Sequence, residues 1–265
     1  MTLPSDDFAA ELAFAHELAD RAAEIAVEVF GREFEVRKKA DLTPVTEADT
    51  GIEAMIRDAI ADRYPGDAIL GEEQGLAGSG SRVWIVDPID GTKNFAARIP
   101  VWATLVALAV DGDLKVGLAS APLIGERYAA ARGKGATMNG RPIRVSATTN
   151  VDEALVAIAG VRPWLERPDR DAFLALAAEA DRFRGFGDFW GHVLVARGAA
   201  DAMLEAELRT WDYAALEVIV AEAGGVMTQV DGSPLADGGS VLSANPALHE
   251  TIAARFTGNS ARAGA

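Results

Sequence analysis

The stretch that decides the fold reads Val83-Trp84-Ile85-Val86-Asp87-Pro88-Ile89-Asp90-Gly91-Thr92. Its first four residues are β-branched or aromatic, which predicts a buried strand. Asp87 and Asp90 follow around a proline-fixed turn, so both carboxylates can reach one small volume. Gly91 and Thr92 then offer backbone N–H groups to an anion. Carboxylates alone would repel that anion, and a divalent cation with oxygen ligands removes the conflict. The stretch therefore predicts a metal-dependent phosphatase site.

Two amphipathic helices are predicted before this stretch. Residues 8–30 and 49–64 carry apolar side chains at helical spacing, and each run ends at a glycine or at a Pro-Gly pair. Residues 41–46 between them are expected to form a loop, because Pro44 disfavours helix at the residue before it. The N-terminal part is thus predicted to begin with two amphipathic helices separated by a loop.

The period of the apolar pattern changes at about residue 68. Short β-like runs are predicted at 68–70, 83–86, 102–110, 115–121, 127–131 and 143–145, and their turns suggest a meander. After about residue 150, strand-like and helical segments alternate, which is an α/β pattern. We therefore expect an N-terminal α+β half at 1–148 that carries most metal ligands. A C-terminal α/β half at 149–265 would close the active-site cleft, and the two would form one compact unit.

Four acidic clusters stand at the ends of predicted elements. They are Glu72 with Glu73, Asp87 with Asp90, Asp212, and Asp49 next to Thr46. Each has a simpler interpretation, because Asp is a preferred helix N-cap and a Glu pair is often a solvated turn. Together they could converge where strand and helix ends meet, which is where α/β proteins generally bind ligands. Converging acids without a metal would repel one another.

Composition restricts the partners. The chain has 265 residues, a formal net charge of −15 and no cysteine. An acidic surface argues against nucleic acid or an anionic membrane as a partner. The lack of cysteine excludes Cys-ligated zinc and a cysteinyl-phosphate intermediate, and fits a reducing compartment. With no basic-apolar leader at the start, we expect a cytoplasmic protein. The signatures of phospho-aspartate, phosphohistidine and Walker-type enzymes are absent.

The motifs resemble those of the inositol monophosphatase superfamily of Mg²⁺-dependent phosphomonoesterases. The matching motifs lie at 41–49, 71–73, 84–95 and 211–215, followed by 222–225. They occur in the family's order and cover most of the chain. The resemblance implies the layered αβαβα sandwich that this superfamily shares with fructose-1,6-bisphosphatase. Within the superfamily, stretches such as 43–49, 100–105 and 184–190 are most similar to the bacterial histidinol-phosphate phosphatases.

The resemblance also implies a set of ligands for two or three Mg²⁺ ions. One ion would bind Glu72, Asp87 and the carbonyl of Ile89; a second would bind Asp87, Asp90 and Asp212; a third, weaker ion would lie near Glu72. Phosphate would bridge the metals and rest on the N–H groups of Gly91 and Thr92. A metal-activated water, oriented by Thr92 and Asp49 together with Glu72, would attack in line without a covalent intermediate.

The implied substrate is a small phosphorylated metabolite, L-histidinol phosphate. Its leaving group carries an amine and an imidazole, which Asp188 and Glu205 could recognise. In the simpler interpretation, Asp188 caps a helix and Glu205 is a surface acid. An inositol-1-phosphate or broad sugar-phosphate phosphatase is the alternative enzyme, and a catalytically silent binding protein is the alternative from another class. The family suggests a homodimer, for which residues 102–110 could supply an interface or simply be core.

Overall fold

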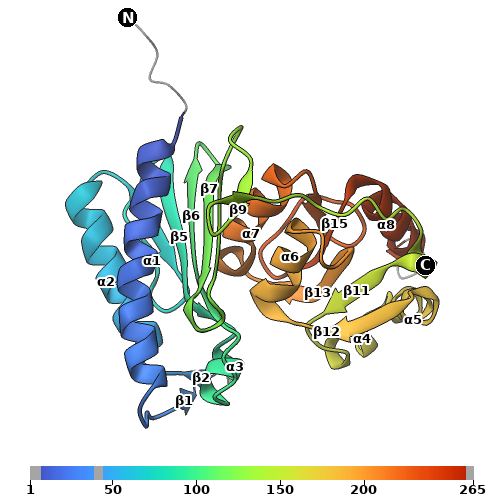
Figure 1. Ribbon diagram of the computed structural model, residues 1–265, viewed down its shortest axis with the longest axis horizontal. Helices are drawn as coiled ribbons and strands as arrows, with labels where there is room; N and C mark the ends of the chain where they lie inside the picture. Colours follow the sequence, from blue (N-terminus) through green and yellow to red (C-terminus); the bar gives the residue numbers. More distant parts are fainter. Residues whose placement is uncertain (1–6, 39–43, 261–265) are drawn as a thin grey trace, which may run out of the picture. The chain divides into compact units, whose positions relative to one another are not determined.

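The computed structural model describes residues 7–38 and 44–260, without the side chains of 258–260 (Figure 1). Residues 41–43 of the predicted loop lie outside this range. Contacts divide the chain into two units, Met1–Arg141 with Trp211–Ile219, and Pro142–Thr210 with Val220–Ala265. The segment Trp211–Ile219, which a boundary at residue 148 would give to the C-terminal half, therefore groups with the N-terminal one.

The first unit is built on an eight-stranded sheet of order β10-β9-β8-β7-β6-β5-β3-β4. Its strands are β3 Ala68–Gly71, β4 Gly75–Ala77, β5 Arg82–Asp90, β6 Ala103–Val110, β7 Asp113–Ala121, β8 Glu126–Ala131, β9 Ala136–Met138 and β10 Arg141–Pro142. From β5 to β9 each strand pairs antiparallel with the next, as the meander predicts. Residues 143–145 were expected to be a strand and are irregular. A small ladder of β1 Arg37–Lys38 and β2 Pro44–Val45 lies apart from this sheet.

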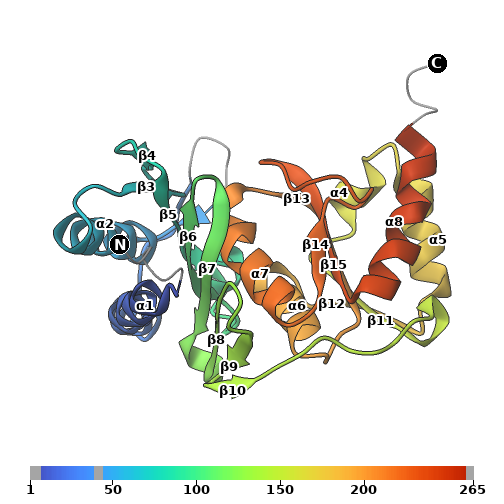
Figure 2. The same cartoon turned by 90° about the horizontal axis from the view of Figure 1, so that it is seen from above.

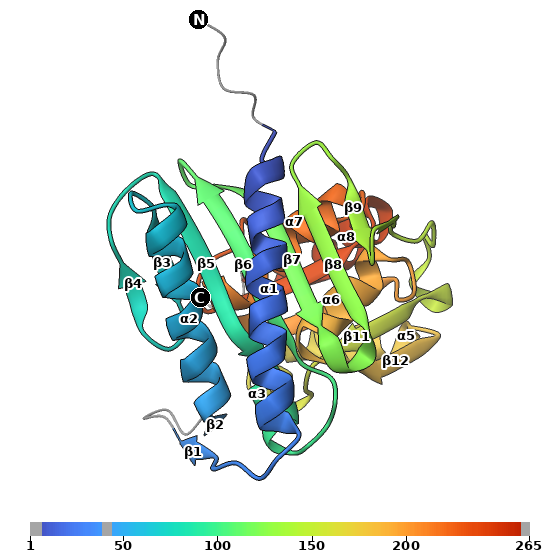
Figure 3. The ribbon, with the colours of Figure 1, turned by 60° about the vertical axis from the view of Figure 1, so that its left-hand side comes forward.

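Two long helices cover one face of the sheet (Figure 3). Helices α1 (Ala9–Phe30) and α2 (Glu47–Arg63) pack on each other, on β5 and on the central strands. Alternate strand residues such as Trp84, Val86 and Leu118 point into this layer. The apolar side chains on alternate strand positions thus pack against the apolar face of α1 in one hydrophobic core.

Strand β5 does not end at Val86 as predicted. It continues through the acidic residues to Asp90, and its pairing with β6 shifts register between Asp87 and Asp90. Pro88 lies in this irregular part, where the missing N–H of proline is tolerated. The hydroxyl of Thr104 on β6 donates to the Pro88 carbonyl at 2.8 Å. The two aspartates are therefore held by the sheet itself and not by a free turn.

Helix α7 (Thr210–Glu222) provides, through residues 211–219, the cover for the other face of this sheet. Gly117 on β7 touches it so closely that an added Cβ would lie 2.3 Å from the Ala215 carbonyl oxygen. Asp87 pairs with Leu105, and Leu105 pairs with Ala119, two positions along β7 from Gly117. Because side chains alternate along strands, Asp87 points to the α7 face.

The second unit has a five-stranded mixed sheet of order β12-β11-β13-β15-β14 (Figure 2). Its strands are β11 Leu155–Ile158, β12 Arg182–Gly185, β13 Ala202–Leu208, β14 Val226–Thr228 and β15 Gly239–Ala244. Helices α4 (Arg162–Leu165), α5 (Arg170–Glu179) and α8 (Pro246–Ser260) pack on one face. Helix α6 (Asp188–Ala196) packs on the other. The predicted alternation of strands and helices is found here.

Short helical turns complete the chain: α3 Thr92–Ala96, and the 3₁₀ turns Pro122–Ile124 and Val151–Glu153. Within residues 7–38 and 44–260, no helix is both long and apolar enough to cross a membrane.

Candidate active site

Three aspartates gather on the α7 face of the first unit. Asp87 and Asp90 come from the irregular end of β5, and Asp212 comes from the first turn of α7. One carboxylate oxygen of each lies within 4.8 Å of those of the other two. Asp87 and Asp90 are buried, whereas Asp212 is partly exposed. The structure therefore brings together acids that are far apart in the sequence and that would repel one another if all were ionised.

Glu72 lies beside this trio at the end of the parallel neighbour of β5. Gly71 pairs with Val86, and the Glu72 N–H continues the ladder to the Val86 carbonyl at 3.3 Å. The Glu72 carboxylate can accept a hydrogen bond from Asp87 when Asp87 carries a proton. The pKa of Asp87 is raised well above its ordinary value, chiefly because the group is buried. The negative charges of Glu72, Asp90 and Asp212 raise it further.

Asp49 and Thr92 form a second polar pair near Glu72. Thr46 is the N-cap of α2, and Asp49 completes the capping box by accepting from the Thr46 N–H at 2.8 Å and hydroxyl at 2.6 Å. Asp49 therefore does stabilise the start of α2, as the third helical residue of a capping box and not as the N-cap itself. Burial nevertheless raises the pKa of Asp49, and the charge of Glu72 adds to this effect although the bonds from Thr46 oppose it.

Thr92 connects this pair to the end of β5. Its hydroxyl donates to the Ile89 carbonyl at 2.9 Å and lies 3.5 Å from Asp49 Oδ1. Gly91, which precedes Thr92, adopts φ = 85°, a left-handed conformation that favours glycine. This turn lets α3 start directly after the strand, so that the N–H groups of Gly91 and Thr92 stand at its first turn.

The two acids predicted to contact the substrate alcohol belong to the second unit. Glu205 lies on β13, is only 6% exposed and pairs with Val241 next to a register irregularity, so it is not a surface acid. Asp188 is the first residue of α6, and its φ of 51° is unusual for a residue other than glycine. The N-cap position is occupied by Gly187, so Asp188 is the first helical residue and not the cap. Backbone strain of this kind is often stored at functional sites.

Sequence reasoning missed two supporting side chains in the first unit. Thr104 holds the Pro88 carbonyl, and nothing in its local sequence distinguishes it from an ordinary strand threonine. Glu53 is fully buried on α2. A signal for Glu53 was present, since it lies seven residues before Ile60 and therefore on the apolar face of the helix.

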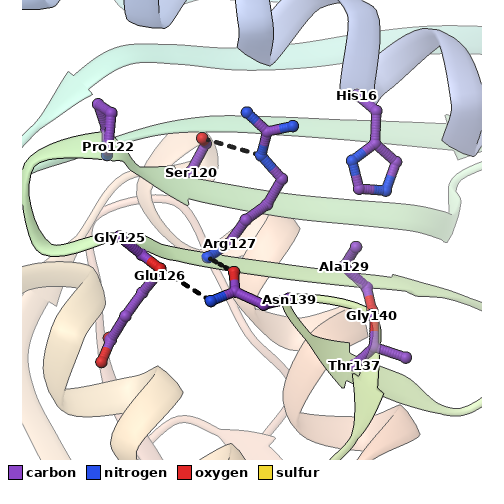
Figure 4. A pocket seen from close by; sticks show the side chains of 10 residues that line it. All are labelled: His16, Ser120, Pro122, Gly125, Glu126, Arg127, Ala129, Thr137, Asn139 and Gly140. Atoms are coloured by element: carbon purple, nitrogen blue, oxygen red, sulfur yellow. Dashed lines mark hydrogen bonds between the residues drawn. The ribbon is translucent and has the colours of Figure 1, made fainter.

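A separate cavity of about 420 Å³ lies between α1 and the β7–β8 hairpin (Figure 4). His16, Ser120 and Arg127 line it, and Arg127 donates to the Ser120 hydroxyl at 3.1 Å. Burial and the charge of Arg127 lower the pKa of His16. None of the predicted site residues lines this cavity, which opens on the α1 side of the sheet.

The sequence model of the inositol monophosphatase family matches residues 9–260. The chain belongs to the inositol monophosphatase family. Two curated relatives are the histidinol-phosphatases of Streptomyces coelicolor and Mycobacterium tuberculosis. They are 41% and 42% identical over 257 and 253 residues, which is 93% of this chain in both cases and 96% and 97% of theirs.

A solved inositol monophosphatase from Zymomonas mobilis is 31% identical, with a TM-score of 0.84 over 95% of this chain and 99% of that one. The layered α and β fold of the family, expected from the motifs, is therefore confirmed. The acids on β5 and α7 thus occur in a chain that matches known phosphatases over at least 93% of its length.

Proposed function

We propose that this chain hydrolyses L-histidinol phosphate to L-histidinol and phosphate with the help of Mg²⁺. The chain is a phosphoric monoester hydrolase, since the relatives across its family are named as phosphatases of this class. The choice of substrate is supported by the sequence identity of about 41–42% to two histidinol-phosphatases across nearly the full length of all three proteins. That similarity exceeds the 31% shared with the solved inositol monophosphatase.

The acids of the site suit a hard divalent cation. Asp87 lies beside three other carboxylates, and its pKa is raised first by burial and then by their negative charges, so ionised Asp87 is costly in the metal-free cluster. Oxygen ligands of this kind fit Mg²⁺. In the proposed assignment, Glu72, Asp87 and the Ile89 carbonyl would hold one ion, and Asp87, Asp90 and Asp212 a second. A third ion near Glu72 is part of the same proposal.

When bound, the ions would neutralise charge on the phosphoryl oxygens and the leaving oxygen and would lower the pKa of a coordinated water. The protein's own groups would position the reactants. The N–H groups of Gly91 and Thr92 would donate to the phosphate. The Thr92 hydroxyl and the Asp49 carboxylate would orient the attacking water and direct its proton, with Glu72 close by. Because burial raises the pKa of Asp49, its carboxylate is a better proton acceptor than an exposed one.

The leaving alcohol would be recognised by acidic groups. L-Histidinol presents an amine and an imidazole, and both can donate hydrogen bonds to carboxylates. We assign this role to Asp188 and Glu205, on the strength of their acidic character in a chain 41% and 42% identical to two histidinol-phosphatases. The partial strain at Asp188 and the burial of Glu205 support a specific role for each. A homodimer and a cytoplasmic location complete the proposal.

The test is phosphate release by the purified protein across a small substrate panel. We expect kcat/KM for L-histidinol phosphate to exceed that for inositol-1-phosphate by about tenfold or more, which is about 1.4 kcal/mol of differential transition-state binding. EDTA should abolish activity on both substrates, and Mg²⁺ should restore it. A preference for inositol-1-phosphate would support the second candidate function, which the solved inositol monophosphatase favours.

A further inference from the structure

A fully buried carboxylate supports the loop that carries Glu72. Glu53 on α2 accepts the Glu73 N–H at 2.7 Å with Oε2 and the Gln74 N–H at 3.0 Å with Oε1. Arg57, one helical turn further, donates its Nε–H to Glu53 Oε1 at 2.9 Å and a second N–H to the Gly75 carbonyl. The pair thus satisfies three successive backbone groups of one turn.

This turn is the hairpin between β3 and β4. Gly71 pairs with Gly75, so residues 72–74 form the connection. Glu53 also lies against Gly71 at the start of the turn. The contact is so close that a Cβ added to Gly71 would be 2.4 Å from the Glu53 carboxyl group. On the other side, the Glu72 N–H is bonded to the Val86 carbonyl. The backbone at Glu72 is therefore fixed both by the sheet and by Glu53.

A charged side chain is a costly way to fill this position. Glu53 lies on the buried face of α2 between Ile52 and Ile56. An apolar residue of similar volume would avoid the cost of removing a carboxylate from water. What the carboxylate supplies, and an apolar group cannot, is two directed acceptors that fix the turn in one conformation. In that conformation the Glu72 N–H is bonded to the carbonyl of Val86, the residue before Asp87, and the Glu72 carboxylate lies within hydrogen-bonding reach of Asp87.

We propose that Glu53, held by Arg57, is a positioning residue that sets the affinity of the acidic site for divalent cations by fixing Glu72 against Asp87. The inference rests on the proposed role of Glu72 as a metal ligand. Glu53 acts only through Glu72 and touches neither metal nor substrate. Outer groups that orient metal ligands typically change metal affinity by about 10–100-fold, and we expect an effect in this range.

The experiment measures Mn²⁺ binding to substrate-free protein by electron paramagnetic resonance, with Mn²⁺ as a probe for the divalent site. Glu53→Gln keeps the size of the side chain but places an NH₂ group against backbone donors. We expect its Kd for Mn²⁺ to rise at least about tenfold. The value of kcat at saturating Mg²⁺ should stay within about threefold of wild type. Asp201→Asn is the matched control, because Asp201 is also a buried carboxylate that accepts a backbone N–H, from Leu155 at 2.7 Å.

A double-mutant cycle with Glu72→Gln separates this inference from the proposed function. In the Glu72→Gln background, Glu53→Gln should cause no further loss of Mn²⁺ affinity, because a positioning residue acts through its partner. Independent, additive losses would overturn the inference. So would an unchanged Kd in Glu53→Gln when Glu72→Gln alone weakens binding, and in that case the proposed function would stand.

An unchanged Kd in Glu72→Gln itself would remove Glu72 from the metal site and overturn the inference, whereas the phosphatase activity is tested separately by phosphate release. Melting in EDTA shows which variants fold. If Glu53→Gln does not fold, Arg57→Lys replaces it, because lysine keeps the charge but not the fork that joins Glu53 to Gly75. Arg57→Lys should raise the Kd for Mn²⁺ by at least about threefold, and no change would overturn the proposal.

Discussion

In metal-free protein, replacing Asp87 by Asn should raise thermal stability instead of lowering it. Asn has the shape of Asp, and its carbonyl oxygen can still accept the Ile89 N–H that Asp87 Oδ1 accepts at 2.9 Å. The substitution therefore removes charge from the acidic cluster and leaves the packing of β5 in place. The expected gain comes from relief of repulsion and of the cost of burying a charge.

The spacing of the acids gives the size of the effect. One carboxylate oxygen of each aspartate lies within 4.8 Å of those of the other two, and two charges at that limit repel by about 3.5 kcal/mol at an effective dielectric constant of about 20. Asp87 has two such neighbours, Asp90 and Asp212. Proton uptake by Asp87, together with water and salt around the partly exposed Asp212, relieves much of this. We expect a net gain of about 2 kcal/mol at neutral pH, which raises the Tm of a chain of this size by about 4–8 °C.

The sign of the pH dependence follows from the direction of the pKa shift. In the folded, metal-free protein the pKa of Asp87 lies well above its ordinary value of 3.8. The folded state therefore holds the proton to higher pH than the unfolded chain does. The group's contribution to stability is present below the unfolded pKa and is lost as pH rises through the folded pKa. The advantage of the Asp87→Asn variant over wild type should accordingly be small in acid and grow toward neutral pH.

The assay is thermal unfolding in EDTA at several values from about pH 5 to pH 8, where the carboxylates of an unfolded chain are ionised. Asp67→Asn is the matched control, because Asp67 is a buried carboxylate paired with Arg82 at 3.0 Å. Its neutralisation should lower Tm. A Tm for Asp87→Asn below that of wild type at every pH would refute the view that the acids strain the metal-free fold.

Three further predictions concern catalysis. Asp90→Asn should lower kcat with Mg²⁺ by about a hundredfold or more, since it removes a proposed metal ligand; near-normal steady-state turnover would contradict that role. Thr92→Ala should lower kcat at saturating Mg²⁺ more than it weakens metal binding, because its hydroxyl is assigned to the attacking water. A collapse of Mg²⁺ affinity with normal kcat would assign Thr92 to the metal instead. Glu205→Gln and Asp188→Asn should raise KM for L-histidinol phosphate and barely affect p-nitrophenyl phosphate, and equal losses on both would mean that these acids support the fold.

The long helices and the meander could be predicted because their signals are local. Apolar residues recur at helical spacing through α1 and α2, and turns punctuate the strands that follow. The path of β5 could not be predicted in the same way. Asp87, Pro88 and Asp90 favour a turn when they are considered alone, and only pairing with β6 and the hydroxyl of Thr104 keep them in the sheet.

The convergence of the acids also depends on tertiary structure. Asp212 reaches Asp87 because α7 crosses the face of the sheet over Gly117, and no spacing in the sequence specifies that crossing. The placement of the acids at element ends suggested that they could converge, and the resemblance to a known family implied which of them share an ion. The place of Glu53 on the apolar face of α2 was a signal in the sequence, but its role depends on the hairpin that it supports, which only the tertiary structure shows. The contact of Asp188 and Glu205 with the leaving alcohol of the substrate stays a prediction.

The position of α7 has a consequence for synthesis of the protein on the ribosome. Gly117 and its neighbours are covered by residues 215 and 218, which are made roughly a hundred residues later. A nascent chain that has emerged only to Arg141 contains every strand of the first sheet except the second residue of β10, yet one face of that sheet stays bare. It also lacks the third aspartate of the acidic cluster. The first unit can therefore cover its sheet and complete its acidic cluster only after most of the second unit has left the exit tunnel, an order that leaves apolar surface open to chaperones during translation.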